Sequence, residues 1–192
     1  MNDKVGKQVA PRPPSREELE AARDKRIKDV IGPDLDVLFC GINPGLYSGA
    51  TGHHFARPGN RFWPTLHLSG FTDRLLTPYE ERDLLSQRLG ITNLVNRTTA
   101  RADELSREEL VKGARTLRRK ILRHRPAFLA VLGLSAFRVA FGQPGSGIGL
   151  QNELIGDTKV WLLPNPSGLN AHYQLPDLAR LFGELREAAG TN

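Results

Sequence analysis

Four short apolar runs divide the chain and predict buried β-strands, at residues 37–42, 91–99, 127–132 and 159–163. The runs are rich in β-branched and aromatic residues and end at turn-forming residues, which is the pattern of strands covered on both faces. The second run is a short strand that leads into a polar loop. Segments with helical patterns separate the runs. This alternation predicts an α/β fold, a single-domain three-layer α/β/α arrangement with a mainly parallel central sheet flanked by helices.

Start and stop signals define the expected helices. Ser15 and Ser106 are each followed three residues later by a glutamate, which is the capping-box pattern. Pro78 can occupy the first position of another helix, where its missing amide donor does no harm. The expected helices cover residues 15–31, 61–69, 77–90, 106–124 and 135–141, with a last one from 176, and the glycine-rich residues 142–149 are expected to form a flexible loop.

The first strand ends abruptly at Asn43-Pro44-Gly45. Pro44 has no amide donor and Gly45 favours positive φ, so neither continues a strand. We therefore expect Asn43 at a strand end with its side chain facing a cleft, where open α/β sheets bind their ligands. The loop that follows carries two histidines, a phenylalanine and arginines. Such content is typical of a functional loop, although a plain strand-to-helix turn is the alternative.

The same pattern returns near the C-terminus, at residues 160–170. An apolar strand is followed by Asn165-Pro166 and then by small residues that lead to Leu169, which we expect to be exposed at the tip of a loop. Two such turns at the ends of parallel strands can face each other across one crevice.

Composition predicts one domain with one core, because the chain has 192 residues, 39% of them hydrophobic and 25% charged. We expect residues 1–14 to form a disordered basic arm and residues 15–192 to form the domain. The single cysteine, Cys40, excludes an internal disulfide, fits a reducing cytosol and lies in an apolar run, so we expect a core residue rather than a nucleophile. Neither a membrane-spanning run nor a signal-peptide pattern is present, and we expect a cytoplasmic protein without membrane contact.

The charge balance is basic, with a net charge of +6 and a pI of about 9.8. This balance favours a polyanionic partner, although many basic proteins bind no nucleic acid. Arginines and a lysine cluster at residues 115–125 and could follow phosphates or form one solvated helix face. The chain contains neither a GxGxxG nor a GxxxxGK[ST] pattern, which argues against a dinucleotide-dependent or NTP-dependent enzyme.

Two motifs carry a family resemblance. The stretch Gly41-Ile-Asn-Pro-Gly45, followed by Gly52-His-His-Phe and Pro58-Gly-Asn-Arg-Phe-Trp, resembles the mismatch-specific uracil-DNA glycosylases and the thymine-DNA glycosylases. The stretch Asn165-Pro-Ser-Gly-Leu169 is similar to their second motif. The resemblance runs from about residue 30 to about residue 185 in the same order and spacing. It implies a uracil-DNA glycosylase-like domain that cuts uracil from mismatched double-stranded DNA, above all opposite guanine, in base excision repair, with thymine or modified pyrimidines as further candidates.

The chemistry of base release fits these residues. Breaking the bond between a base and deoxyribose places positive charge on the sugar and negative charge on the departing pyrimidine. Backbone amides at the first motif can donate to the leaving carbonyl oxygens. Asn43 can position water but is no strong base, so catalysis must depend on stabilising the leaving group. The resemblance gives the same water-orienting role to Asn43. The motifs contain no lysine for a Schiff base, so we expect a monofunctional enzyme without a cofactor.

The resemblance also implies a base pocket. A flipped base costs less to extrude when it is mispaired, and an aromatic side chain can stack on it. The resemblance assigns stacking to Phe55, a contact to the base or to water to His54, and the C5 edge of the ring to Ser48. A core phenylalanine, a structural histidine and ordinary polar strand ends are the alternatives. The expected base-pocket residues are Ile42, Gly45, Ser48, His54, Phe55, Asn93 and Thr99. His53 and His54 form no convincing metal site, because no further ligands follow at suitable spacing.

The second motif is expected to supply a wedge. Leu169 matches the family residue that enters the base stack, and we call Asn165, Pro166, Ser167, Gly168 and Leu169 the wedge loop. Relatives carry an arginine two positions after the wedge or close by, whereas this chain has Ala171 and His172. Arg57 and Arg61 are weaker candidates for phosphate contacts.

Two other functions stay open at this point. A non-catalytic DNA mismatch-binding module could use the same wedge loop, and a nucleosidase could use the same chemistry on free nucleosides. The wedge loop argues against free nucleosides, and Asn43 at a strand end argues against binding alone. The expected partner is double-stranded DNA with a mismatched or damaged pyrimidine, bound by a monomer.

Overall fold

A computed structural model describes residues 12–191 of the chain. Residues 1–11 and 192 lie outside the description, and with them most of the predicted N-terminal arm. Residues 12–14 of the predicted arm are described and contact the first helix. The guanidinium of Arg12 donates to both carboxylate oxygens of Glu18, at 2.9 and 2.7 Å.

A five-stranded sheet forms the centre of the fold, with the strand order β2-β1-β3-β5-β4. The first four strands in this order run parallel, and β4 joins the edge of the sheet in the antiparallel sense. The strands are β1 (Val37–Gly41), β2 (Leu89–Asn93), β3 (Phe128–Leu132), β4 (Gly149–Ile155) and β5 (Thr158–Leu163).

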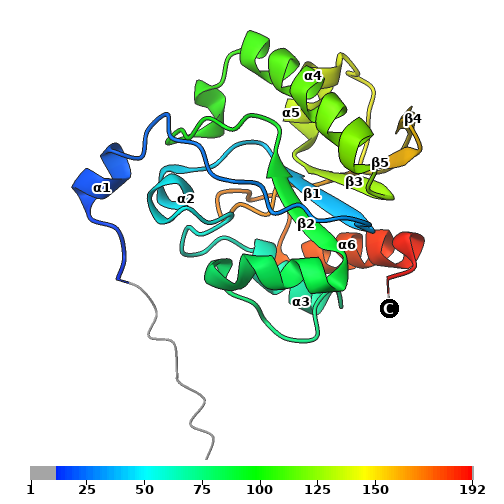
Figure 1. Ribbon diagram of the computed structural model, residues 1–192, viewed down its shortest axis with the longest axis horizontal. Coiled ribbons are helices and arrows are strands. Elements are labelled where there is room, and N and C mark those ends of the chain that lie inside the picture. The colour runs from blue at the N-terminus through cyan, green and yellow to red at the C-terminus, as the bar shows by residue number, and fades with distance from the viewer. Residues whose placement is uncertain (1–11, 192) are drawn as a thin grey trace, which may run out of the picture.

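Helices cover both faces of the sheet, so the predicted three-layer fold is confirmed. In Figure 1, α4 and α5 lie above the sheet, and α3 and α6 lie below it. Two short helices, α1 and α2, contact each other at one end of the sheet. The helices are α1 (Arg16–Glu20), α2 (Leu46–Thr51), α3 (Phe62–Leu68), the 3-10 helix η1 (Pro78–Gln87), the 3-10 turn η2 (Ala102–Glu104), α4 (Arg107–His124), α5 (Leu134–Phe141) and α6 (Leu175–Ala189).

The alternating side chains of β1 connect the two layers of the core. Phe39 packs among α3 and α6, where its ring centroid lies 5.5 Å from that of Phe62 and 5.8 Å from that of Phe182. Leu38 and Cys40 face the opposite layer under α4 and α5. Burial raises the pKa of the Cys40 thiol to about 12, which fits the predicted core residue and leaves almost no thiolate at neutral pH.

Two helical predictions were wrong. The helix expected over residues 15–31 ends at Glu20, because Asp24 adopts a positive φ of 63° and the chain after it bonds to other segments. The backbone N–H of Asp24 donates to the carbonyl of Thr98, and Val30 exchanges two hydrogen bonds with Ile91. The long loop expected after Gly45 contains α2, and a Gly52 in the left-handed conformation ends that helix.

The strand β4 was not predicted, because its start falls in the glycine-rich stretch expected to be a flexible loop. Leu150 and Leu154 on this edge strand are 57% and 51% exposed, while Ile155 is buried. An edge strand with exposed leucines lacks the continuous apolar run that identified the central strands. The segment expected as a helix over residues 77–90 is a 3-10 helix, η1, that begins at Pro78 and ends before Arg88.

Candidate active site

The two Asn-Pro turns meet at the carboxyl ends of the parallel strands. A cavity of about 630 Å³ opens there, and both motifs line it. This arrangement agrees with the expectation that the two turns face each other across one crevice. The lining includes Pro44, Gly45, Ser48, His54, Phe55, Arg57 and Asn60 from the first motif, Asn165, Ser167 and Leu169 from the second, and Asn93 from the end of β2.

Asn43 follows β1, is half-buried and directly precedes the cavity-lining Pro44, but is not itself part of the lining. Its Nδ2 donates to the carbonyl of Arg97 at 2.9 Å and to the hydroxyl of Thr99 at 2.7 Å. A carbonyl oxygen only accepts hydrogen bonds, so the amide nitrogen must be the atom that faces Arg97. The amide oxygen of Asn43 accepts no hydrogen bond from any residue of the described chain. Its free function is therefore that of an acceptor.

Thr99 supports Asn43 and does not line the cavity. Its hydroxyl accepts from Asn43 and donates to the carbonyl of Arg101 at 2.7 Å, and its backbone N–H donates to the carbonyl of Pro44. Ile42, also predicted for the base pocket, is absent from the cavity lining as well and lies near Gly133. The structure thus places Thr99 behind Asn43, where it fixes the orientation of the amide.

Phe55 and Asn93 form the inner wall of the cavity. The Phe55 ring stacks on Phe62, with centroids 4.0 Å apart and an angle of 24° between the planes. Phe55 adopts a φ of 52°, which is uncommon for a residue with a side chain. A Cβ at Gly41 would lie 2.7 Å from Oδ1 of Asn93 and 3.2 Å from the Phe55 ring. Only glycine at position 41 lets these two side chains come so close to the strand.

Ser48 is buried, and its position agrees with a small residue at the cavity wall. Its hydroxyl oxygen accepts from the backbone N–H of Ala56 at 3.2 Å, which ties α2 to the loop that follows Phe55. The hydroxyl proton of Ser48 has no acceptor among residues 12–191. A single oxygen therefore holds the loop and still has a proton to donate.

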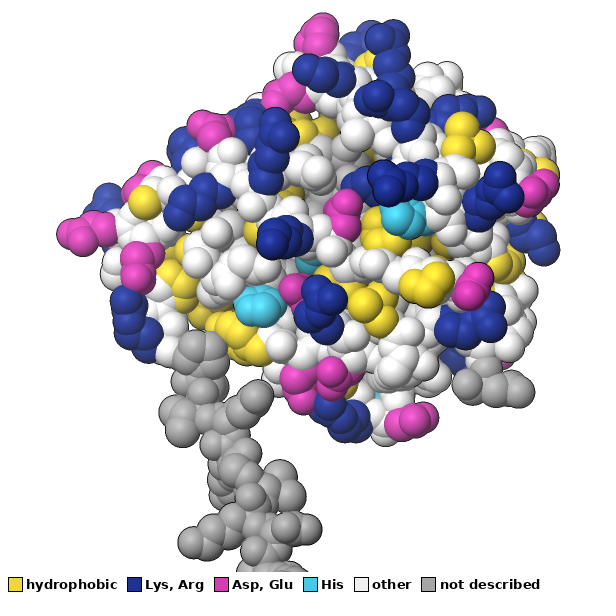
Figure 2. Space-filling view, viewed as in Figure 1, with side chains coloured by type: hydrophobic (Ala, Val, Ile, Leu, Met, Phe, Trp, Pro, Cys, Tyr) yellow, Lys and Arg dark blue, Asp and Glu magenta, His cyan; other side chains and the backbone are white. Residues whose placement is uncertain are grey.

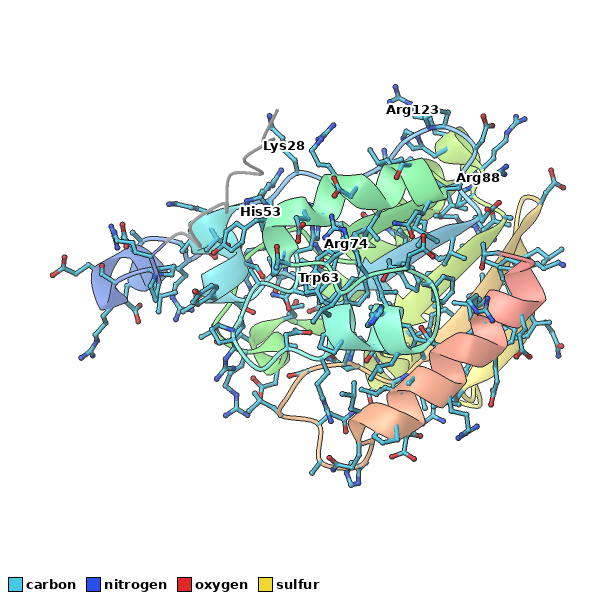
Figure 3. The ribbon with its side chains drawn as sticks, turned by 90° about the horizontal axis from the view of Figure 1, so that it is seen from below. Lys28, His53, Trp63, Arg74, Arg88 and Arg123 are labelled. Atoms are coloured by element: carbon cyan, nitrogen blue, oxygen red, sulfur yellow. The ribbon has the colours of Figure 1, made fainter. Side chains whose placement is uncertain are left out.

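Glu81 of η1 contacts both adjacent histidines, and no pattern in the sequence indicates these contacts. Its Oε2 accepts from the backbone N–H of His54 at 2.8 Å and lies 2.9 Å from Nδ1 of the same residue, and its Oε1 lies 3.0 Å from Nδ1 of His53. Burial by itself raises the pKa of Glu81, but the hydrogen bonds from the ring and backbone of His54 and from His53 outweigh it and lower the pKa below its ordinary value. Glu81 is therefore a carboxylate at neutral pH. Figure 3 labels His53, which follows α2, and Trp63, which lies in the first turn of α3.

The wedge loop presents Leu169 to solvent, with 73% of the residue exposed. Short-range hydrogen bonds shape the loop: Oδ1 of Asn165 accepts from the backbone N–H of Ser167, and Oγ of Ser167 accepts from that of Leu169. A Cβ at Gly168 would lie 2.7 Å from the carbonyl oxygen of Gly59, so the loop packs directly against the first motif. Among the exposed large hydrophobic side chains of the described chain, Leu169 has the highest exposed fraction.

Comparison with known proteins decides the family. The uracil DNA glycosylase superfamily matches residues 28–187. The chain belongs to the uracil DNA glycosylase superfamily. A solution NMR structure from Methanosarcina acetivorans, described as a "putative Uracil DNA glycosylase", aligns with a TM-score of 0.58 and 16% sequence identity, over 85% of this chain and 98% of that chain. At this identity the structural match shows the shared fold, while membership of the superfamily supports DNA glycosylase activity.

Arg61, a weaker candidate for a phosphate contact, uses its side chain to bind the chain around the wedge loop. Its guanidinium donates to the carbonyls of Tyr173, Ser167 and Asn170 at 2.6, 2.5 and 2.9 Å. Its backbone N–H donates to the carbonyl of Pro166. Arg61 is therefore the residue that fastens the wedge loop to the first motif. Arg57 lines the cavity and stays a candidate for a phosphate contact.

Basic side chains are spread widely over this uracil DNA glycosylase superfamily member. Figure 2 shows Lys and Arg over most of one face, with Asp and Glu between them. The arginines of α4 are exposed and form a solvated helix face, while Lys120 turns inward to bond Asp29 at 2.6 Å. Within residues 12–191, no group of three or more His, Cys, Asp or Glu could hold a metal ion. No helix of the described chain is long and apolar enough to cross a membrane.

Proposed function

We propose that the chain is a monofunctional DNA glycosylase that flips uracil out of mismatched duplex DNA, especially opposite guanine, and hydrolyses the N-glycosidic bond in base excision repair. Thymine and modified pyrimidines opposite guanine are further candidate substrates. The enzyme acts as a cytoplasmic monomer without a cofactor. One observation carries the proposal: the free amide acceptor of Asn43 follows β1 directly before Pro44, and Pro44 lines the same cavity as the exposed Leu169.

Asn43 acts on the attacking water. Because Arg97 and Thr99 occupy its amide protons, Oδ1 can only accept, and a water molecule that donates to it turns an oxygen lone pair toward the sugar. The oxygen of the water bonds to the anomeric carbon as the bond to the base breaks, the base leaves as an anion with the bonding electrons, and the added water then loses one proton to solvent. An amide does not remove the proton from water before attack, so the departing base must be well stabilised.

The cavity wall fits a pyrimidine. Phe55 offers a ring face next to the Asn93 amide, which carries both a donor and an acceptor for the polar edge of uracil. Stacking of a base on an aromatic ring contributes on the order of 1–3 kcal/mol. A mispaired base needs less energy to leave the helix, so the same cavity favours uracil opposite guanine over uracil opposite adenine.

Leu169 fills the space that the flipped base leaves. An apolar side chain that enters the stack replaces lost base contacts and delays the return of the base. The loop is fastened by Arg61 before DNA binds, so little conformational entropy is lost when Leu169 enters the duplex.

The test uses end-labelled duplexes that contain uracil opposite guanine, uracil opposite adenine or thymine opposite guanine, each incubated with the protein and then treated with alkali. We expect strand cleavage only after alkali, fastest for uracil opposite guanine. Mismatch binding without alkali-labile sites would instead indicate a binding module, and release of uracil from free deoxyuridine would indicate a nucleosidase. Cleavage before alkali, or a protein–DNA adduct trapped by borohydride, would contradict the monofunctional mechanism.

A further inference from the structure

The carboxylate of Glu81 determines where the ring of His54 carries its proton. An ionised carboxylate only accepts hydrogen bonds, and its Oε2 lies 2.9 Å from Nδ1 of His54, so that nitrogen must be the donor. In the neutral imidazole the other nitrogen, Nε2, then keeps its lone pair. The tautomer of His54 is thus set by a residue of η1, outside both motifs.

Nε2 of His54 is buried and has no hydrogen-bond partner within residues 12–191. His54 is only 1% exposed, yet it lines the cavity beside Phe55 and Asn93. Buried polar atoms in proteins nearly always have a partner, so an unpaired acceptor at a cavity wall points to a ligand that donates to it.

We propose that Glu81 is a positioning residue that presents Nε2 of His54 to the cavity as a hydrogen-bond acceptor for an N–H or O–H donor. This inference rests on the proposed function, in which two donors reach the cavity: the ring N–H of the flipped pyrimidine and the attacking water. The same carboxylate oxygen accepts from the backbone N–H of His54, directly before the positive φ of Phe55. Glu81 therefore fixes the ring of His54 and the chain that leads to Phe55 together.

Substitution of Glu81 by glutamine distinguishes positioning of the His54 ring from a requirement for the negative charge of Glu81. In Glu81→Gln the backbone N–H of His54 is a fixed donor and selects the amide oxygen of the glutamine, which also accepts from Nδ1. The amide nitrogen then faces His53, whose ring can change its tautomer. Glu81→Gln thus keeps His54 as it is, whereas Glu81→Ala releases it.

The direct measurement is the tautomer of His54, read from the ¹⁵N resonances of its ring in histidine-labelled, DNA-free protein. We expect a proton on Nδ1 in the wild type and in Glu81→Gln, and a shift toward the Nε2-protonated form in Glu81→Ala. A His54 ring that keeps the same tautomer in Glu81→Ala, or that carries its proton on Nε2 in the neutral wild type, would overturn the proposal.

Activity gives the second readout, as the single-turnover rate of uracil release opposite guanine. Loss of an oriented hydrogen bond typically costs about tenfold, so we expect Glu81→Ala to slow release by about tenfold or more and Glu81→Gln by less than about threefold. Asp83→Ala removes a solvent-exposed carboxylate from the same helix and serves as the matched control, with an unchanged rate. Thermal unfolding verifies that each variant is folded. If folded Glu81→Gln is as slow as Glu81→Ala, the charge and not the orientation matters, and the proposal is wrong.

A binding measurement distinguishes the two possible donors to Nε2, the pyrimidine and the water. It uses a duplex with 2′-fluoro-2′-deoxyuridine opposite guanine, which is not cleaved because the electron-withdrawing fluorine opposes bond cleavage. If the pyrimidine donates to Nε2, Glu81→Ala weakens binding of this duplex by several fold. If water donates, binding is unchanged and only the rate of release falls. Failure of the proposed function itself is distinguishable, because a wild type that releases no uracil would still report the tautomer of His54 by NMR.

Discussion

The amide nitrogen of Asn43 donates to acceptors on the protein alone, at Pro44, Arg97 and Thr99, and this limits what the side chain can do for the reaction. Its Nδ2 donates to Arg97 and Thr99, so only its oxygen faces substrate or water. We expect Asn43→Ala to lower single-turnover uracil release by about 100-fold or more, since a misplaced nucleophile alone costs about that much. Binding of a mismatched duplex should change by less than about threefold, because Asn43 is not part of the cavity lining.

Gel-shift or anisotropy titration gives the binding, and quenched time courses give the rate. Loss of two hydrogen bonds also costs about 1–3 kcal/mol of stability, so the variant has to be compared below its unfolding temperature. Equal losses of binding and rate would make Asn43 a structural residue.

Thr99 holds the amide of Asn43, so substitution of its hydroxyl tests the orientation of Asn43 without removing Asn43 itself. Thr99→Val keeps the shape of the side chain but removes both the acceptor for Asn43 and the donor to Arg101. We expect uracil release to fall by about tenfold, the ordinary effect of one hydrogen bond, with Thr99→Ser close to the wild type. A Thr99→Val rate equal to the wild-type rate would show that Arg97 alone holds the amide.

At the scale of elements, the wedge loop depends on one side chain from another motif. Arg61 donates to three carbonyls in and after the loop, so Arg61→Gln should loosen it. We expect weaker binding of mismatched duplex and slower uracil release. The slope of log affinity against log salt concentration should stay the same, because no phosphate contact is lost. A slope reduced by about one would instead restore the phosphate role expected from the sequence.

The sequence was sufficient to predict those helices and strands that are recognisable from their own residues. Every residue of β1 is buried, so its apolar run was visible, and the capping box at Ser106 correctly marked the start of α4. The end of α1 was not predictable, because pairing of residues 24–30 with distant segments overrides the helical pattern. Five of the seven residues expected in the base pocket line the cavity, whereas Ile42 and Thr99 do not. The contacts of Glu81 with His54 and of Arg61 with the wedge loop were not predictable, because the partners lie 27 and 106–112 residues away and no local pattern indicates such contacts.

At the scale of the whole molecule, the positive charge is not concentrated at the cavity. Figure 3 shows Arg88 and Arg123 at the end of the molecule away from His53. This follows from the topology: Arg123 lies in the last turn of α4 and precedes β3, so it lies at the amino ends of the parallel strands, while the cavity lies at their carboxyl ends.

Salt dependence tests this distribution. We expect Arg57→Ala to reduce the slope of log affinity against log salt concentration by about one, because Arg57 lines the cavity and can meet a phosphate of the bound duplex. Arg123→Ala removes the same charge from the far end and should leave the slope unchanged. Equal effects of the two variants would mean that DNA affinity depends on the net charge of the protein alone, or that DNA binds another face.

The burial of Cys40 has a practical consequence for following the reaction. The thiol is fully enclosed, its pKa is raised to about 12 by burial, and it is the only cysteine of the chain. Reagents such as maleimides react with accessible thiolates, so we expect them not to react with Cys40 in the folded protein. A second cysteine introduced at the exposed Ala171, next to the wedge loop, would therefore take up a fluorophore selectively, without removal of the native one. Entry of Leu169 into a duplex could then be timed by fluorescence, separately from the cleavage step.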